Sequence, residues 1–497
     1  MRIDRRIGIL LESQCKENDF LFILIKNPLK RLIAPTWRFP RGRDMGGAGG
    51  IPARRPLPSA PMSRRLPVEC WNRMPRDHVA SYYAATANDR TERPSLAGSL
   101  AVDIAVVGGG FTGLSAALEL AERGYQVALL EAERIGWGAS GRNGGQVNTG
   151  YRMGPAALVA RFGRAWAKQL WQLGEAAKQL IRDRIRRHAV ACDYRSGTIY
   201  AAVHDADLAE IAADLEFEIH DFGYDQASAL DRAAMAERLG TSIYRGGLAD
   251  AGGAHIHPLK YALGLARAAE AAGAKLFEAS RATHIDPAGH GVETAAGRIA
   301  ARQVLLCCNG YLDGLMAPLA ARILPISNYI IATEPLGEAG ARALIRDDVA
   351  VCDSKFVVNY YRRSADHRLL FGGGEVYTRR DPRDIKEFVR RHMLAVYPQL
   401  ASARIDFGWG GRLAITMNRL PHLGRLAPDL YFAHGYSGQG VALAGLAGTL
   451  MAEAIAGTAE RFDVFARIPH RKFPGGRLLR HPAQILGMLF YSLRDRF

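Results

Sequence analysis

Short apolar runs alternate with Ala- and Leu-rich helical patterns over most of the chain. Residues 102–107 form an apolar run that predicts a buried parallel strand. After a glycine cluster, an Ala/Leu pattern predicts a helix to about Arg123, with Gly124 at its C-terminal cap. Residues 125–130 predict a second strand that ends at Glu131. Strand, glycine turn, helix, strand and acid together indicate a βαβ unit.

The rest of the chain mixes both periodicities. Helices are predicted near residues 165–187, 206–217, 258–272 and 385–397, and again up to Ile455. Pro258 suits the first turn of its helix, where a missing N–H costs nothing. Strands are predicted at residues 198–203, 275–278, 291–294, 304–308, 328–333, 356–361, 368–372 and 430–433. Because the two kinds of block are interleaved, we expect two domains that are each discontinuous in sequence.

We therefore predict an α/β protein with a Rossmann-like dinucleotide-binding domain and a smaller α+β substrate domain built on an antiparallel sheet. The dinucleotide-binding domain is expected to comprise residues 98–155, 246–322 and 406–470. The substrate domain is expected to comprise residues 156–245 and 323–405. Residues 62–97 form a lead-in, residues 1–61 a basic extension, and residues 471–497 a basic amphipathic end.

Composition fits a globular protein, with 497 residues of which 48% are hydrophobic and 23% charged. The formal net charge is +16. Residues 1–61 read either as a flexible extension or, as we favour, as sequence upstream of the true start, with Met62 as the initiator. They show no secretory signal, and the apolar run at residues 20–25 is far shorter than the ~20 residues of a membrane span.

Charge and cysteine usage narrow the possible partners and the compartment. Basic residues form no stripe with interleaved aromatics, so no nucleic-acid partner is expected. The six cysteines form no C-x-x-C pair, which favours a reducing compartment and a cytoplasmic location. His255 and His257 lack a third ligand, so we expect no metal site. The end of the chain, residues 473–497, packs on the protein's own flank or touches a membrane surface, and we favour packing.

The glycine cluster at residues 108–113, here called the first glycine loop, matches G-x-G-x-x-G. Gly108 permits the tight turn, Gly110 lets a pyrophosphate approach the backbone, and Gly113 allows close packing of helix on strand. Phe111 and Thr112 begin the helix whose N-terminus favours a phosphate. Glu131 is placed to accept hydrogen bonds from ribose hydroxyls. An acid at this position argues against the 2′-phosphate of NADP, but it does not distinguish FAD from NAD.

Two further glycine loops favour a long, extended cofactor over NAD alone. The second glycine loop, residues 136–146, has a backbone that is able to lie against a flat ligand. Its candidate contacts are Ala139, Ser140, Arg142, Asn143, Gly144, Gly145 and Gln146. The third glycine loop, residues 435–440, precedes a small-residue helix, and Gly438, Gln439 and Gly440 form a nest for negative charge.

These three loops, with residues 252–258, 81–87, 309–311 and 368–373, resemble the D-amino-acid-oxidase-type flavoproteins over residues 76–497. The resemblance implies FAD, with further contacts from Ala282, Asn309, Gly310 and Gly411. It implies oxidation of an amine, gamma-glutamylputrescine or a relative, to an imine that water hydrolyses, with O2 reduced to H2O2. Some relatives attach FAD through a cysteine near residues 409–416, which contain none here, so non-covalent FAD is expected.

The resemblance also suggests catalytic candidates. Gln439 falls where a related branch has a histidine beside the flavin. Arg362, expected on an edge strand, loosely matches an arginine that holds a substrate carboxylate. Tyr360 and Tyr361 point to opposite faces of one strand, and we expect Tyr361 to enter the pocket.

Three other functions stay open at this point. One is a flavin dehydrogenase or oxidase of a D-amino acid or N-alkyl amino acid, passing electrons to a quinone or carrier. The second is a tRNA-binding modification enzyme. The third is a non-catalytic dinucleotide-binding protein.

Overall fold

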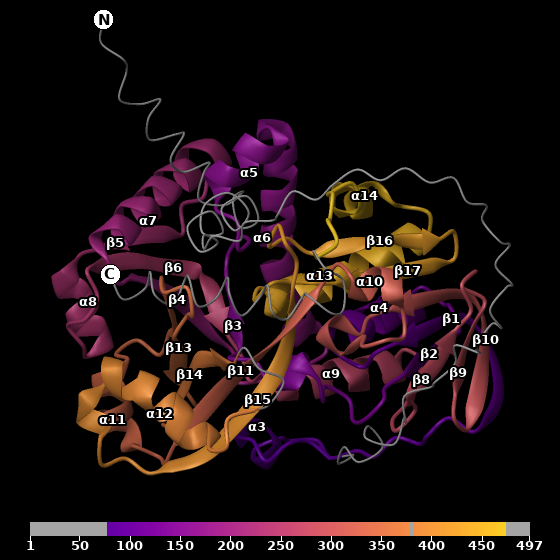
Figure 1. The fold of residues 1–497 in the computed structure, drawn as a ribbon, viewed down its shortest axis with the longest axis horizontal. Coiled ribbons are helices and arrows are strands. Elements are labelled where there is room, and N and C mark those ends of the chain that lie inside the picture. The colour runs from indigo at the N-terminus through magenta and orange to yellow at the C-terminus, as the bar shows by residue number, and fades with distance from the viewer. Residues whose placement is uncertain (1–76, 377–380, 474–497) are drawn as a thin grey trace, which may run out of the picture. The chain divides into compact units, whose positions relative to one another are not determined.

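Two β-sheets organise the residues that the computed structural model describes, 77–376 and 381–473. Residues 1–61, and all but the first few residues of the predicted basic end, lie outside that description. Figure 1 shows the two sheets side by side, with helices covering their outer faces. No helix in the described ranges is long and apolar enough to cross a membrane.

The first sheet has the strand order β16-β17-β10-β1-β2-β7. Its parallel strands are β1 (Gly98–Val107), β2 (Val127–Leu130), β7 (Lys275–Phe277), β10 (Gly297–Leu306) and β17 (Leu430–His434). The antiparallel strands are β16 (His422–Ala427), β8 (Ala282–Ile285) and β9 (Gly291–Thr294). This order brings strands that are far apart in sequence next to one another.

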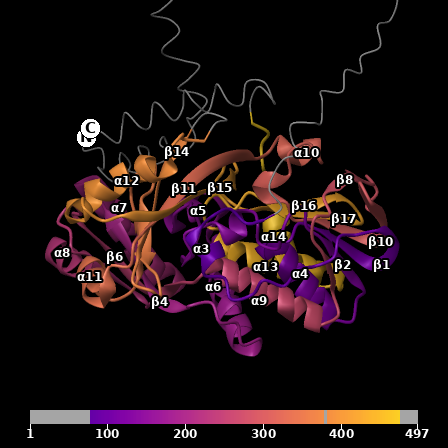
Figure 2. The same cartoon turned by 90° about the horizontal axis from the view of Figure 1, so that it is seen from below.

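Apolar side chains on alternate positions of the first sheet bury both of its faces. On one face lie α4 (Phe111–Glu122), α9 (Pro258–Ala271) and α13 (Gly440–Ile455), followed by α6 (Arg164–Arg187) and α14 (Glu460–Ala466). Figure 2 shows α4, α9 and α13 together under this sheet. On the other face β8, β9 and α10 (Ala317–Ala320) enclose a separate core. A Cβ at Gly448 would lie 2.2 Å from the Thr112 carbonyl oxygen, so only glycine permits this approach of α13 to α4.

The second sheet has the order β15-β11-β14-β13-β12-β4-β6-β3, with β5 beside β6. Its strands are β3 (Gln146–Val147), β4 (Arg195–Ala202), β5 (Ala227–Leu230), β6 (Gly246–His255), β11 (Leu324–Thr333), β12 (Ala350–Asp353), β13 (Tyr360–Arg363), β14 (Leu369–Val376) and β15 (Ile405–Ile415). All neighbours are antiparallel except β4 and β12. The expected antiparallel sheet is therefore present, with one parallel pair.

Three helices cover one face of the second sheet. These are α8 (Arg232–Leu239), α11 (Gly337–Leu344) and α12 (Ile385–Val396), whose apolar residues form a core with that face. On the opposite face α7 (Asp205–Phe217) packs against β5 and β6, and Tyr360 of β13 faces the second glycine loop. The remaining helices are α3 (Tyr82–Ala85), α5 (Pro155–Phe162), the π-helix η3 (Glu218–Phe222) and the 3-10 turns η2 (Ala139–Gly141), η4 (Asn309–Tyr311) and η5 (Pro398–Leu400).

Most predicted elements are present, but the strand predicted at residues 356–361 is wrong by several residues. β13 starts only at Tyr360, because the Asp353 carboxylate accepts the backbone N–H and side-chain amide of Asn359, each at 2.8 Å, and so holds a turn. β13 also lies between β12 and β14, so the edge-strand position expected for Arg362 is wrong.

The domain boundaries stay a prediction. The chain passes between the sheets several times, and β3, β6 and β15 belong to the second sheet although their residues were assigned to the dinucleotide-binding domain.

Candidate functional site

The carboxyl ends of the parallel strands bring three glycine-rich or polar segments to one edge of the first sheet. Val107 pairs with Leu130 and with Leu306, so these strands end level with one another. The first glycine loop therefore lies beside Glu131 and beside the segment that leads to Asn309. The third glycine loop follows β17, the neighbour of β10. In open parallel sheets ligands bind at this edge.

The first glycine loop is too tight for side chains. Gly108 has a φ of +113°, and a Cβ there would lie 2.7 Å from the Cys307 carbonyl oxygen. A Cβ at Gly113 would lie 1.9 Å from the Gly108 carbonyl oxygen, because α4 begins directly against the strand. Gly110 is the N-cap of α4, and a Cβ there would lie 2.8 Å from the Ser140 hydroxyl oxygen. Gly108 and Gly113 thus have the tight turn and the close packing of helix on strand, whereas the approach of a pyrophosphate at Gly110 stays a prediction.

Glu131 closes one side of this loop. Its carboxylate accepts the backbone N–H of Gly109 at 2.7 Å and that of Glu133 at 2.9 Å. Burial raises the pKa of Glu131, and the two N–H donors oppose that effect. The carboxylate is therefore fixed beside the turn, where the sequence places the ribose.

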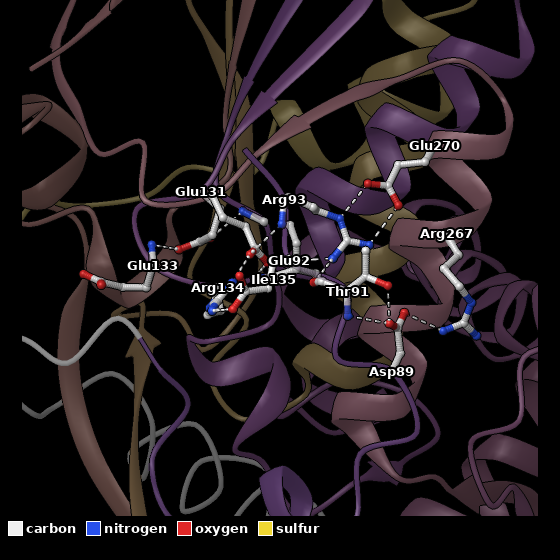
Figure 3. A network of polar contacts seen from close by, with 12 residues as sticks. Asp89, Thr91, Glu92, Arg93, Glu131, Glu133, Arg134, Ile135, Arg267 and Glu270 are labelled. Carbon is white, nitrogen blue, oxygen red and sulfur yellow. Dashed lines mark hydrogen bonds and ion pairs between the residues drawn. The ribbon is translucent and has the colours of Figure 1, made fainter. Parts of the chain in front are cut away.

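An ion-pair network holds the chain around Glu131, and Figure 3 shows it. The Glu278 carboxylate accepts the backbone N–H of Ile135 at 2.8 Å and lies 2.9 Å from Arg134 and 3.7 Å from Arg93. Arg93 also pairs with Glu270 at 2.6 Å. The network ties the residues that follow Glu131 to the lead-in segment.

Ala282 lies at the start of β8, on the same side of the first sheet. The Ser280 N–H donates to the Glu131 carbonyl oxygen at 2.8 Å, which brings the segment before Ala282 alongside Glu131. Ala282 itself packs against the core enclosed by β8 and β9.

The second glycine loop is pinned onto the start of α4. Ser140 accepts the Phe111 N–H at 2.9 Å, so its hydroxyl caps one of the free donors of the helix. Asn143 stabilises the loop itself, because its amide donates to the Ala139 carbonyl at 2.9 Å and accepts the Gly145 N–H at 2.8 Å. Ser140 and Asn143 thus shape the loop around the first glycine loop.

Two side-chain donors in the second glycine loop have no hydrogen-bond partner in the described part of the chain. Arg142 donates through Nε to the Trp137 carbonyl at 2.6 Å and through Nη1 to the Gly410 carbonyl at 3.3 Å, and its guanidinium lies 3.9 Å from the Trp137 ring centre. Its Nη2 is buried without a hydrogen bond, as is the Nε2 of Gln146. Burial lowers the pKa of Arg142. Buried donors are normally satisfied, so these two point to a ligand that accepts hydrogen bonds.

The third glycine loop is joined to the first. The Tyr436 hydroxyl lies 2.7 Å from the Thr112 hydroxyl, and the Gly435 N–H donates to the Asn309 side-chain oxygen at 2.9 Å. Gln439 is the N-cap residue of α13, which starts at Gly440. Gly438 has a φ of +97° and no atom within 4 Å of a Cβ built there, so this turn faces open space. Its helix end offers N–H donors toward the sheet edge.

Remaining predicted contacts come together at the junction of the two sheets. A Cβ at Gly310 would lie 3.2 Å from the Arg412 carbonyl oxygen, and one at Gly411 would lie 3.1 Å from the Arg142 Cβ. The Trp409 indole donates to the Arg142 carbonyl at 3.0 Å. Trp409 thereby connects β15 to the second glycine loop, a link that no sequence pattern indicated.

Tyr360 faces the second glycine loop, and Tyr361 does not. A Cβ at Gly144 would lie 2.7 Å from the Tyr360 ring, and Gly372 leaves room for the same ring from β14. The Tyr360 hydroxyl donates to the Asn328 side-chain oxygen on β11. Tyr360 and Asn328 are both partly exposed on this face of the sheet. Asn328 carried no sequence signal, whereas the alternation around Tyr360 already indicated that one of the two tyrosines packs.

The catalytic role expected for Tyr361 does not fit the structure. Tyr361 is 1% exposed in the core beneath α12, stacks on Phe371 with ring centres 5.3 Å apart, and its hydroxyl lies 3.0 Å from that of Tyr244. Burial raises its pKa. The register of β13 puts Tyr361 on the face away from the glycine loops.

Arg362 faces the second glycine loop but is not a free carboxylate ligand. Its Nε donates to the Gly144 carbonyl at 2.7 Å, and its Nη2 to the Ile256 carbonyl at 3.0 Å and the Tyr83 hydroxyl at 3.2 Å. Nη1 donates to the Arg363 carbonyl at 3.0 Å. The predicted bidentate hold on a substrate carboxylate stays a prediction, and these protein contacts occupy donors that it would need.

His255 and His257 serve the fold. His255 ends β6 and contacts the Asp348 carbonyl at 2.8 Å, and His257 accepts the Lys260 N–H at 3.1 Å as the N-cap of α9. Within the described ranges, no group of three or more potential ligands lies close enough to hold a metal ion. The four cysteines of the described part are free thiols.

Comparison with known proteins adds the family. Residues 103–454 match the model of the family described as "DAO: FAD dependent oxidoreductase". The chain is 43% identical over 424 residues, 84% of this chain and 99% of the relative, to gamma-glutamylputrescine oxidoreductase from Escherichia coli (strain K12). It is 39% identical, over 85% of this chain and 98% of the relative, to "Probable oxidoreductase OrdL" from Haemophilus influenzae. Among solved structures, glycine oxidase from Geobacillus kaustophilus has the same fold, with a TM-score of 0.63, 22% identity, and coverage of 75% of this chain and 100% of that one.

Proposed function

Because the chain belongs to the family of FAD-dependent oxidoreductases and acts on amine donors, we propose that its substrate is gamma-glutamylputrescine or a closely related amine and that O2 accepts the electrons. One observation carries the substrate assignment: the 43% identity extends over 99% of an enzyme named for that substrate. The solved structures support the fold alone, since the glycine oxidase is only 22% identical.

The residues at the sheet edge fit FAD. The N-terminus of α4 and the first glycine loop suit the pyrophosphate, and Glu131 suits the ribose. Arg142 and Gln146 hold buried donors without partners, as expected for residues that contact a ligand rich in acceptors. Residues 409–416 contain no cysteine, so we propose that the FAD is bound non-covalently and is released when the protein is denatured.

Bound FAD would supply the acceptor for a hydride from the carbon that carries the amine and would allow the two electrons to pass on to O2. The overall reaction is R–CH2–NH2 + O2 + H2O → R–CHO + NH3 + H2O2, in which the imine formed first is hydrolysed. The chain's task is to bind the amine in its neutral form, because a protonated nitrogen has no lone pair to assist the loss of hydride. A partly desolvated site disfavours the ammonium form without a dedicated base.

Side chains and backbone at the junction of the two sheets supply the remaining functions. We propose that the N–H groups at the start of α13, which follow Gly438 and Gln439, stabilise negative charge on the flavin ring. We propose that Tyr360 and Asn328 position the amine, because Tyr360 faces the second glycine loop from the second sheet and Asn328 accepts its hydrogen bond. This replaces the role first expected for Tyr361.

The test is an anaerobic panel of amines with the purified yellow protein. Gamma-glutamylputrescine should bleach the long-wavelength flavin absorbance faster and at lower concentration than putrescine, sarcosine, glycine or D-alanine. Admission of O2 should then restore the absorbance with stoichiometric H2O2. Bleaching by sarcosine or a D-amino acid alone would refute the substrate, and slow reoxidation without peroxide would refute O2 as the acceptor.

The non-catalytic and the tRNA-binding alternatives each predict a different experimental result. A protein whose FAD no amine bleaches would be a non-catalytic binder, and salt-sensitive retention of tRNA on a filter would revive the nucleic-acid hypothesis. A cytoplasmic location stays a prediction.

A further inference from the structure

Arg362 carries a buried positive charge without a counter-ion. The residue is 3% exposed. Its partners are three carbonyl oxygens and the Tyr83 hydroxyl, at 2.7 to 3.2 Å. In the described part of the chain no carboxylate lies within the 4.0 Å of an ion pair, and Asp366, close in sequence, is bonded to Arg368 at 2.7 Å. Buried charges are normally paired, because removing an unpaired ion from water is strongly unfavourable.

Three titratable groups beside the guanidinium are neutral. They are Tyr83 on α3, His255 at the end of β6, and His257 before α9. Burial raises the pKa of Tyr83, which keeps it neutral. Burial and then the charge of Arg362 lower the pKa of His255 to about 3, and the same two causes lower the pKa of His257.

Two carboxylates lie behind these groups, Asp348 beside His255 and Asp366 beside Tyr82. Each is paired with another arginine, Asp348 with Arg363 at 3.4 Å and Asp366 with Arg368 at 2.7 Å. Neither forms an ion pair with Arg362, whose field is weakly screened in this buried region.

A second arginine repeats the arrangement at the other end of the second glycine loop. Arg142 binds the Trp137 and Gly410 carbonyls, has no ion pair within the described ranges, and has a buried Nη2 without a partner. Arg362 binds the loop at Gly144. The loop that lies against the ring system is thus placed between two uncompensated cations.

We propose that Arg362 is a positioning residue whose charge acts through residues 144–145 on bound FAD, favouring negatively charged forms of the flavin ring. The negative charge that the flavin ring acquires would then be the counter-charge that Arg362 lacks in the described part of the protein. The same field disfavours an ammonium ion beside the ring. This proposal goes beyond the substrate assignment and requires only that FAD is bound.

The experiment uses the FAD-loaded protein without substrate. The absorbance spectrum is titrated with base to follow deprotonation of the flavin N3–H, which creates a negative ring. In Arg362→Gln, which removes the charge but keeps amide donors, the midpoint should rise by about one pH unit, a tenfold change in proton affinity. Arg362→Lys keeps the charge and should titrate close to the wild type.

Arg363→Gln is the matched control. It removes the charge of the neighbouring residue, whose guanidinium lies 3.4 Å from Asp348 and is therefore compensated. Its midpoint should equal that of the wild type. The wild type supplies a test that needs no variant, because its N3–H should titrate at lower pH than free FAD.

Three results would overturn the proposal. One is an unchanged midpoint in Arg362→Gln, and another is a wild-type midpoint at or above that of free FAD. The third is the same loss of FAD in Arg362→Gln and Arg362→Lys, which would make Arg362 a structural clamp only. A second arm rests on the proposed function: the pH profile of kcat for the amine, which reports the ionisation of the bound substrate, should move by about one pH unit to higher pH in Arg362→Gln. If only this kinetic test fails, the proposed substrate is contradicted, but the effect of the Arg362 charge on the flavin is not.

Discussion

The two ends of the predicted FAD site are built from the same residue type in opposite ways. At the ribose end, Arg93 and Arg134 each contact carboxylates, and Glu278 joins both to the backbone. At the ring end, the partners of Arg142 and Arg362 among the described residues are neutral oxygens. The ribose end is therefore electrostatically complete before any ligand arrives, and the ring end is not. We conclude that the first arginine pair stabilises the fold, whereas the second awaits charge from a ligand.

The largest effect is expected at the turn that both ends depend on. In Gly113→Ala the new Cβ would lie 1.9 Å from the Gly108 carbonyl oxygen, so α4 must move away from the strand. Overpacking of this kind costs about 3 kcal/mol, and the purified protein should lack FAD. Gly314→Ala is the control, because no atom lies within 4 Å of its Cβ. The flavin-to-protein ratio and the melting temperature measure both effects, and a yellow Gly113→Ala protein of normal stability would contradict the placement of the pyrophosphate.

The next effect separates buried from exposed carboxylates at the ribose end. Glu278→Gln leaves Arg93 and Arg134 without their shared buried partner and should reduce the free energy of unfolding by about 3 kcal/mol. Glu92→Gln removes an acid whose side chain is 77% exposed from the same Arg134 and should cost less than about 1 kcal/mol. Denaturant titration of both variants decides the matter, and equal costs would show that the network is not what holds this end together.

Protonation of His255 should lower the stability of the protein as the pH falls. Its folded-state pKa of about 3 lies below the ordinary value of 6.5, so the fold favours the neutral ring. Its contribution to stability is complete above pH 6.5 and is lost as the pH falls from 6.5 toward 3, by about 2 kcal/mol at pH 5. His255→Gln should lose less stability between pH 7 and pH 5 than the wild type. The exposed His284→Gln is the control, and parallel stability curves for His255→Gln and the wild type would contradict the pKa assignment.

The smallest effects distinguish the two adjacent tyrosines. Tyr361→Phe removes a buried hydroxyl contact to Tyr244 and should cost about 1 kcal/mol of stability while leaving KM for the amine unchanged. Tyr360→Phe removes the hydrogen bond to Asn328 on the site side and should raise KM with little change in stability. The opposite pattern in thermal melts and steady-state kinetics would return the substrate role to Tyr361.

Local features of the site could be read from the sequence. The strand, glycine turn, helix and Glu131 lie within one βαβ unit, so spacing alone places them together. The third glycine loop was also visible in the sequence and favoured a long cofactor, but only the family resemblance implied FAD, and local spacing could not connect this loop to the first. Pairing of β1 with β10, and of β10 with β17, explains why these distant segments meet.

The second sheet was harder to predict, because which of its side chains face the site depends on strand register and on contacts that are distant in sequence. Arg362 contacts residues 106, 218 and 279 positions away, and none of these contacts leaves a periodic trace. A one-residue change of register exchanges the faces of Tyr360 and Tyr361. Whether β13 is an edge or an interior strand likewise depends on β12 and β14, which local sequence does not reveal.

The order of the strands also has a consequence for biosynthesis. The ribose end is complete once β8 has been made, but the N–H groups that begin α13 leave the ribosome more than 150 residues later. A nascent chain therefore has at most half of the predicted FAD site until residue 440 of 497 has been made. FAD should be bound firmly only near the end of synthesis. A shortage of FAD in the cell would therefore affect chains whose translation is almost complete.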